Sequence, residues 1–169
     1  MSRFSENTLR ILEAAGWFPG RHVSTDDFEA YVRQENADCE TEYELAPNDT
    51  IRNFLREFGG LTLTMHRTIP WVRANSFKDS VHTIPIGIPG IKISVFVDDE
   101  EKLLDGDKLY PISNDDDMLW YFMSYSGKVY GRCGVTRFVE IGKDADSWIE
   151  NICNAYSGIP CTPQIVIRE

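Results

Sequence analysis

The sequence is poor in the residues that build metal centres and nucleophilic active sites. It has three histidines and four cysteines in 169 residues. No two ligand candidates among them have the close spacing of a structural zinc site. The cysteines are Cys39, Cys133, Cys153 and Cys161, and in a chain of this size with no expected secretory leader, reduced thiols are favoured over two disulfides. We therefore expect no metal and no cofactor.

Long apolar runs are also missing. The run from Ile84 to Ile91 is short and contains two prolines and two glycines, whereas a membrane-spanning helix needs about 20 mainly apolar residues. The opening stretch Met1–Asn7 carries polar residues where a signal peptide needs a continuous apolar core. We therefore expect a cytosolic protein with no membrane partner.

Positive charge is scarce as well. The chain has 17 lysines and arginines against 27 aspartates and glutamates, which gives a formal charge of −10. Such a surface repels nucleic acid and anionic lipid, so neither is expected as a partner. The acidity suits a basic protein partner, although simple solubility is the plainer explanation.

Catalytic motifs are absent from the sequence. No serine or cysteine stands in a GxSxG nucleophile elbow, and Asp105–Asp107 lacks the spaced acidic pattern of a calcium loop. No Lys-Ser/Thr pair follows Gly87–Gly90, as a phosphate-binding loop requires. We do not expect an enzyme; a small hydrolase with carboxylates and His66 or His82 as base is the remote alternative.

The apolar spacing predicts helices near both ends of the chain. One covers about 6–15 with Ser5 as its N-cap, and a second follows the potential caps Ser24–Asp26. A third runs from Pro47–Asp49 to Gly59–Gly60. A last helix starts near Asp144, carries the apolar stripe Trp148, Ile149, Ile152, Cys153 and Tyr156, and stops at Gly158.

Strand patterns fill the middle of the sequence. Pro111 cannot donate to a ladder and so marks an edge strand, and a two-residue Ser126-Gly127 connection predicts a hairpin. The expected strands are 61–66, segments within 81–97, 109–112, 118–125, 128–133 and 164–167. Helices followed by a meandering antiparallel sheet and a helix indicate one α+β domain over residues 1–169.

Two blocks, Ala14–Arg21 and Phe54–Leu61, are interpreted as scaffold. Trp17 and Arg21 could form an exposed recognition patch, but a tryptophan after a helix-ending glycine more often packs in the core. The arginine then caps carbonyls or pairs with a carboxylate. The expected scaffold residues are Gly16, Trp17, Pro19, Gly20, Arg21, Phe54, Leu55, Phe58, Gly59 and Gly60.

Three acidic clusters, within Glu35–Glu44, Asp98–Glu101 and Asp115–Asp117, are the candidate binding surface. Each is also explained as a solvated turn; a binding role requires them to converge on one face, where they would attract a basic partner. Aromatic residues would supply the affinity core, and Trp120 and Tyr121 must point to opposite faces of the hairpin. The candidate partner-binding residues are Glu40, Glu42, Glu44, Asp98, Asp99, Glu100, Glu101, Asp115, Asp116, Asp117, Trp71 and Tyr125.

Four stretches of the chain resemble the third subfamily of the SUKH immunity superfamily. They are Ala15–Arg21, Phe54–Leu61, Leu109–Ile112 and Gly127–Tyr130, followed by the closing helix that ends on Gly158. The resemblance implies a central antiparallel sheet flanked by helices. It also implies a cytosolic antidote to a secreted or contact-delivered bacterial toxin, often one that attacks nucleic acids. Two positions depart from the pattern: Ser113 replaces a usual glycine, and Tyr125-Ser126 replaces a common acidic pair.

Together, the resemblance and the acidity predict an immunity protein. We expect it to neutralise a cognate polymorphic toxin, a nuclease or deaminase, by noncovalent occlusion with an acidic surface. The family motifs are structural, so they assign no binding residue by position. The alternative is a regulatory scaffold of the SUKH type that binds other partners and no toxin.

Overall fold

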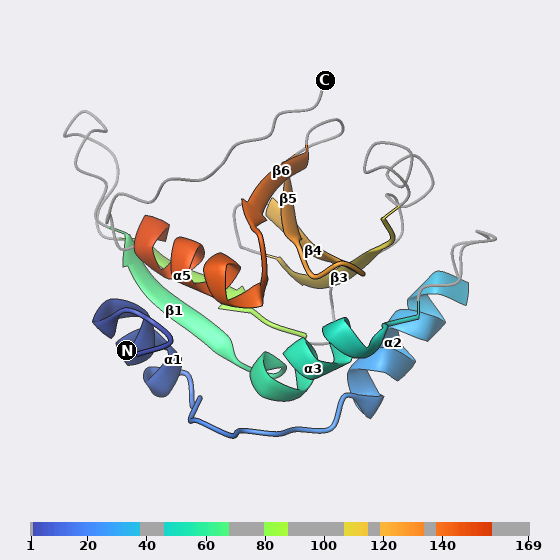
Figure 1. Ribbon diagram of the computed structural model, residues 1–169, viewed down its shortest axis with the longest axis horizontal. Coiled ribbons are helices and arrows are strands. Elements are labelled where there is room, and N and C mark those ends of the chain that lie inside the picture. The colour runs from blue at the N-terminus through green and yellow to red at the C-terminus, as the bar shows by residue number, and fades with distance from the viewer. Residues whose placement is uncertain are drawn as a thin grey trace.

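The computed structural model describes residues 2–37, 46–67, 80–87, 107–114, 119–133 and 138–156. Within these ranges the chain forms four helices and six strands (Figure 1). The helices are α1 (Glu6–Ala14), α2 (Asp26–Ala37), α3 (Asp49–Phe58) and α5 (Ala145–Tyr156). The strands are β1 (Thr62–Arg67), β2 (Ser80–Pro85), β3 (Leu109–Asn114), β4 (Leu119–Ser124), β5 (Val129–Cys133) and β6 (Phe138–Gly142).

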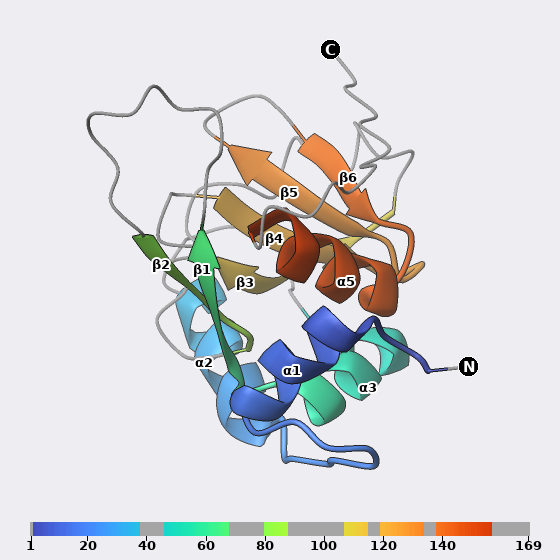
Figure 2. The same cartoon turned by 90° about the vertical axis from the view of Figure 1, so that its left-hand side faces the viewer.

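These strands form two antiparallel sheets, β1-β2 and β3-β4-β5-β6. The sheets meet where Ile86 bridges to Ser113 and the Gly87 N–H donates to the Ile112 carbonyl at 2.8 Å. α5 contacts β6, β1 and α1, and it lies on the side of the four-stranded sheet that faces α1 and α3 (Figure 2). The expected α+β class, with antiparallel strands flanked by helices, is confirmed.

Two helices begin where the sequence predicts, α1 at the predicted cap Ser5 and α3 within the predicted start Pro47–Asp49. The Ser5 hydroxyl accepts from the Thr8 N–H at 3.4 Å at the start of α1. The Asn48 side chain accepts from the Ile51 N–H at 3.0 Å at the start of α3. Each cap satisfies an N–H group that has no partner within its helix.

The β4–β5 hairpin is present, but its loop is one residue longer than predicted. The Ser124 N–H donates to the Lys128 carbonyl at 2.8 Å, which leaves the three residues Tyr125–Gly127 in the loop. Gly127 has φ 96°, the left-handed conformation that closes a three-residue hairpin loop. The two-residue prediction was wrong because glycine ends both kinds of loop.

Of the two edge strands of the four-stranded sheet, the sequence predicted one and missed the other. β3 stands at one end of the strand order, which confirms the edge strand expected from Pro111. β6 at the other end was not predicted. It has only five residues, and its pairing with β5 is interrupted by a register shift beside Val129. Ile141 lies at this irregularity, and its carbonyl accepts from Asn151 Nδ2 of α5 at 2.6 Å.

Other expected elements lie outside the described residues. They are the alternating stretch Ile91–Val97, the helix stop at Gly158 and the strand over 164–167.

The core is organised around Trp148 of α5, whose side chain is fully buried. Its ring lies 5.7 Å from that of Phe54 and 5.3 Å from that of Tyr121, so α3, α5 and β4 meet at one indole. Tyr121 is buried while its neighbour Trp120 is half-buried, in keeping with alternation along a strand. Cys153 is also buried, and this burial raises the pKa of its thiol to about 12.

The close approach of α5 to β6 depends on Gly142. A Cβ atom at this position would lie 2.6–2.7 Å from the backbone N, Cα and Cβ of Trp148. We therefore expect Gly142→Ala to lower the free energy of unfolding by about 3 kcal/mol, because the helix must shift. Gly20→Ala is the control: its new Cβ has nothing within 4 Å, and only its φ of 81° is unfavourable, which costs about 1 kcal/mol. Denaturant unfolding of both variants is the measurement, and equal losses would contradict this contact.

Candidate partner-binding surface

The predicted acidic surface cannot be located on the described part of the chain. Its ten carboxylates and Trp71 lie outside the described residues, so their convergence on one face stays a prediction. Tyr125 is described and is half-buried. Its hydroxyl donates to the Ala46 carbonyl, and its own carbonyl accepts from Asn48 Nδ2 at 2.9 Å. Tyr125 therefore holds the start of α3, and its role in binding stays a prediction.

Charge is distributed unevenly between the described residues and the rest. The described ranges contain 13 aspartates and glutamates against 11 lysines and arginines, a formal charge of −2, whereas the whole chain carries −10. Most of the excess negative charge thus belongs to the other segments. The described part of the chain is therefore nearly neutral.

Trp17 and Arg21 serve the scaffold. Trp17 is 6% exposed, and its ring stacks on Phe58 with centroids 6.3 Å apart and planes 4° apart. The Arg21 guanidinium donates to the Glu57 carbonyl at 2.6 Å and to the Gly59 carbonyl at 2.8 Å. It therefore caps the carbonyl groups at the end of α3, which have no helical partners. Partial burial lowers the pKa of Arg21.

Between these two residues, Phe18 points outward. Its side chain is 58% exposed. The Arg21 N–H donates to the Phe18 carbonyl at 3.1 Å, and Gly20 has φ 81°. With Pro19 at the second position, this is the pattern of a type II β-turn. The sequence predicted the turn from Pro19-Gly20 and the burial of Trp17, and both are confirmed, but it made no prediction for the exposure of Phe18.

A small cavity lies beside this turn. It has a volume of about 190 Å³, and Arg21, Val23, Asp27, Phe28, Leu55 and Gly60 are among the residues that line it. Small-molecule sites usually occupy about 300–1,000 Å³, so the cavity is smaller than a typical small-molecule site. Within the described ranges, no three His, Cys, Asp or Glu side chains are placed to hold a metal ion.

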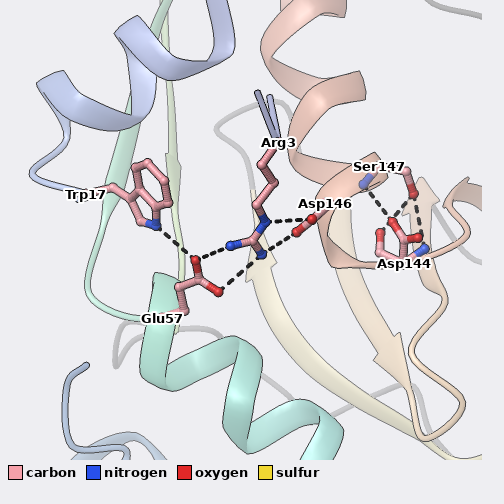
Figure 3. A network of polar contacts seen from close by, with 6 residues as sticks. All are labelled: Arg3, Trp17, Glu57, Asp144, Asp146 and Ser147. Atoms are coloured by element: carbon pink, nitrogen blue, oxygen red, sulfur yellow. Dashed lines mark hydrogen bonds and ion pairs between the residues drawn. The ribbon is translucent and has the colours of Figure 1, made fainter. Parts of the chain in front are cut away.

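An arginine network connects Trp17, Glu57 of α3 and Asp146 of α5 (Figure 3). Arg3 donates to the Glu57 carboxylate at 2.5 and 3.2 Å and to the Asp146 carboxylate at 2.5 and 2.6 Å. The Trp17 indole N–H donates to the same Glu57 carboxylate at 3.3 Å. The bonds to Asp146 are the largest influence on the pKa of Arg3 and raise it; burial opposes them, and the bonds to Glu57 add to them. Residue 3 is thereby fixed to α3 and α5.

The same guanidinium also lies over aromatic rings. Its central carbon is 5.0 Å from the centre of the Phe4 ring and 5.6 Å from that of Phe58, within the range of cation–π attraction. At the start of α5, the Asp144 carboxylate accepts from the Ser147 N–H at 2.8 Å. This cap fixes the turn that carries Asp146 (Figure 3).

The two departures from the expected family pattern have local explanations. Ser113 is fully buried, and its hydroxyl donates to the Pro85 carbonyl at 2.6 Å, which reinforces the junction of the two sheets. At the hairpin, the Ser126 hydroxyl donates to the Asp107 carboxylate at 2.6 Å. An acidic group therefore reaches the loop from a neighbouring segment.

A family model described as SUKH-3 immunity protein matches residues 4–155. The chain belongs to the SUKH-3 immunity protein family. The match takes in the Trp17–Arg21 turn, the end of α3, the hairpin and nearly all of α5. Membership gives this SUKH-3 protein an immunity role.

Two other comparisons add nothing to the family assignment. Searches of curated proteins and of solved structures both gave no match. Among the described helices of this SUKH-3 protein, none is long and apolar enough to cross a membrane.

The Arg3 network is testable by substitution. We expect Arg3→Ala to lower the free energy of unfolding by about 1–2 kcal/mol, since the side chains of Arg3 and Asp146 are 43% and 40% exposed and such pairs contribute modestly. Arg3→Lys should recover less than half of the loss, because lysine lacks the planar fork that spans two carboxylates. Arg10→Ala is the control, since Arg10 bonds only to Asn7 of its own helix among the contacts described. Thermal unfolding of the three variants would show the network to be unimportant if Arg3→Ala and Arg10→Ala behaved alike.

Proposed function

We propose that this SUKH-3 protein neutralises a cognate bacterial toxin in the cytoplasm by binding it one to one and covering its active site. The observation that carries the proposal is the family match over residues 4–155. The whole chain acts as one domain, and it works by binding without chemical turnover. No cofactor takes part.

The proposed toxin acts on nucleic acid, as a nuclease or deaminase, and has a basic active-site cleft. The support for this is the formal charge of −10, most of which lies outside the nearly neutral scaffold. Carboxylates in 40–44, 98–101 and 115–117 would occupy the place of substrate phosphates. Complementary charge would also steer the encounter and raise the association rate about 10-fold or more at low salt.

The first test is calorimetric titration of the full chain into an inactivated toxin domain encoded beside its gene. We expect tight one-to-one binding at low salt, weakened about 10-fold or more at 0.5 M salt, because salt screens exposed charges. Tight binding that is indifferent to salt would keep the immunity function and exclude the acidic mechanism. No binding at either salt would refute the toxin partner and favour a regulatory scaffold.

A charge-matched comparison tests the acidic surface itself. Asp115→Asn/Asp116→Asn removes two charges from a predicted cluster, and Glu6→Gln/Glu13→Gln removes two exposed charges from α1. We expect the first pair to slow association with the toxin several-fold at low salt and the second pair to have a smaller effect. Stopped-flow association rates decide the matter: equal slowing would mean that only the net charge of the protein counts.

A further inference from the structure

The described surface holds a second feature suited to protein recognition, separate from the acidic clusters. We propose that the Phe18 turn and the cavity beside it form the apolar anchor of the toxin interface. In this arrangement Phe18 inserts into a recess of the toxin. An apolar toxin side chain fills the cavity above Phe28 and Leu55, and basic toxin groups next to it meet Asp26 and Asp27. This inference rests on the proposed function and names the contact that would supply its affinity.

The segment around Phe18 is depleted of charge. From Ala14 to Thr25 the sequence has one aspartate, glutamate, lysine or arginine, namely Arg21, in a chain that is 26% charged. The Arg21 guanidinium is directed to two carbonyls at the end of α3. Exposed residues of this segment are Ala14, Gly16, Phe18, Pro19, Gly20, His22 and Ser24. Depletion of charge and enrichment in aromatics distinguish the cores of protein interfaces from other surface.

Phe18 is held in place before any partner arrives. Its carbonyl is bonded to Arg21, the Trp17 N–H donates to the Leu12 carbonyl at 2.9 Å, and the Val23 N–H donates to the Arg56 carbonyl at 2.9 Å. The backbone on both sides of the turn is therefore attached to helices. A backbone that is already fixed loses little conformational entropy on binding, which favours an exposed aromatic on it as a hot spot. A fixed and exposed Phe18 differs in this respect from a surface residue on a loose loop.

The cavity supports an occupant that is apolar with basic neighbours. The buried residues Phe28 and Leu55 line it, and so does Asp27. Asp26 and Asp27 are both exposed at the start of α2. Arg21 also lines the cavity, but its charge is directed to the negative end of the α3 dipole. The exposed carboxylates of Asp26 and Asp27, in the first turn of α2, are the groups that basic side chains of a partner would contact.

The decisive variant is Phe18→Ala, measured by titration of the full-length protein into the inactivated toxin domain. We expect the dissociation constant to rise about 30-fold or more, as for a hot-spot residue. Ser24→Trp places a large ring at the cavity wall and should weaken binding comparably. Val81→Ala is the matched control: Val81 is the other large exposed hydrophobic residue of the described ranges, 51% exposed on β2, and its removal should leave binding within about 2-fold.

The possible results separate the two proposals. Failure of the wild-type protein to bind the toxin domain would overturn the proposed function. Wild-type binding that Phe18→Ala and Ser24→Trp leave unchanged would overturn only the Phe18 anchor. The anchor would also be overturned if Phe18→Ala altered self-association in sedimentation and left toxin binding intact, since the turn would then be a contact between copies. Unfolding midpoints close to wild type, expected for exposed positions, confirm that loss of binding is local.

Discussion

The last turn of α3 exposes carbonyl groups that its own helix cannot satisfy, and much of the structure converges on them. Arg21 reaches the Glu57 and Gly59 carbonyls from the preceding loop, and the Gly60 N–H donates to the Ile86 carbonyl at 2.7 Å. A Cβ at Gly59 would lie 2.3 Å from the Leu55 carbonyl oxygen, so no larger residue fits here. The position of Arg21 also determines where the Phe18 turn is displayed, and Ile86 leads directly into the junction of the two sheets.

The framework of the fold and the excess negative charge belong to different parts of the chain, which the acidic composition alone does not reveal. The described helices and strands form a nearly neutral framework whose polar contacts are largely internal. The excess negative charge belongs to other segments of the chain. In the proposed complex, those segments would govern the rate and direction of encounter, while the rigid apolar turn would slow dissociation. Charge and shape are thus assigned to different parts of one small protein.

Features that depend on neighbouring residues could be predicted from the sequence. The cap at Ser5 and the helix start at Pro47–Asp49 are set within one helical turn, and Pro111 excludes a central strand by its own chemistry. β6 could not be predicted, because it is short and its irregular register is supported by Asn151 from α5, a tertiary contact. The burial of Trp17 was predicted from its place after a helix-ending glycine, whereas the exposure of Phe18 was not, because it depends on the tertiary contact by which Phe58 stacks on Trp17. The candidate binding carboxylates mark a further limit, since spacing in sequence carries no information about convergence in space.

The bonds between Arg3 and Asp146 have a consequence for the order in which the chain folds during its synthesis. They join residues 143 positions apart, and α1 packs directly against α5. During translation, Arg3 leaves the ribosome long before its partner carboxylate exists. α1 can pack against β1 earlier, but its contacts with α5 and the bonds of Arg3 to Asp146 form only after α5 has been made. Contacts between such distant residues slow folding, so the closing step of this fold comes at the end of synthesis.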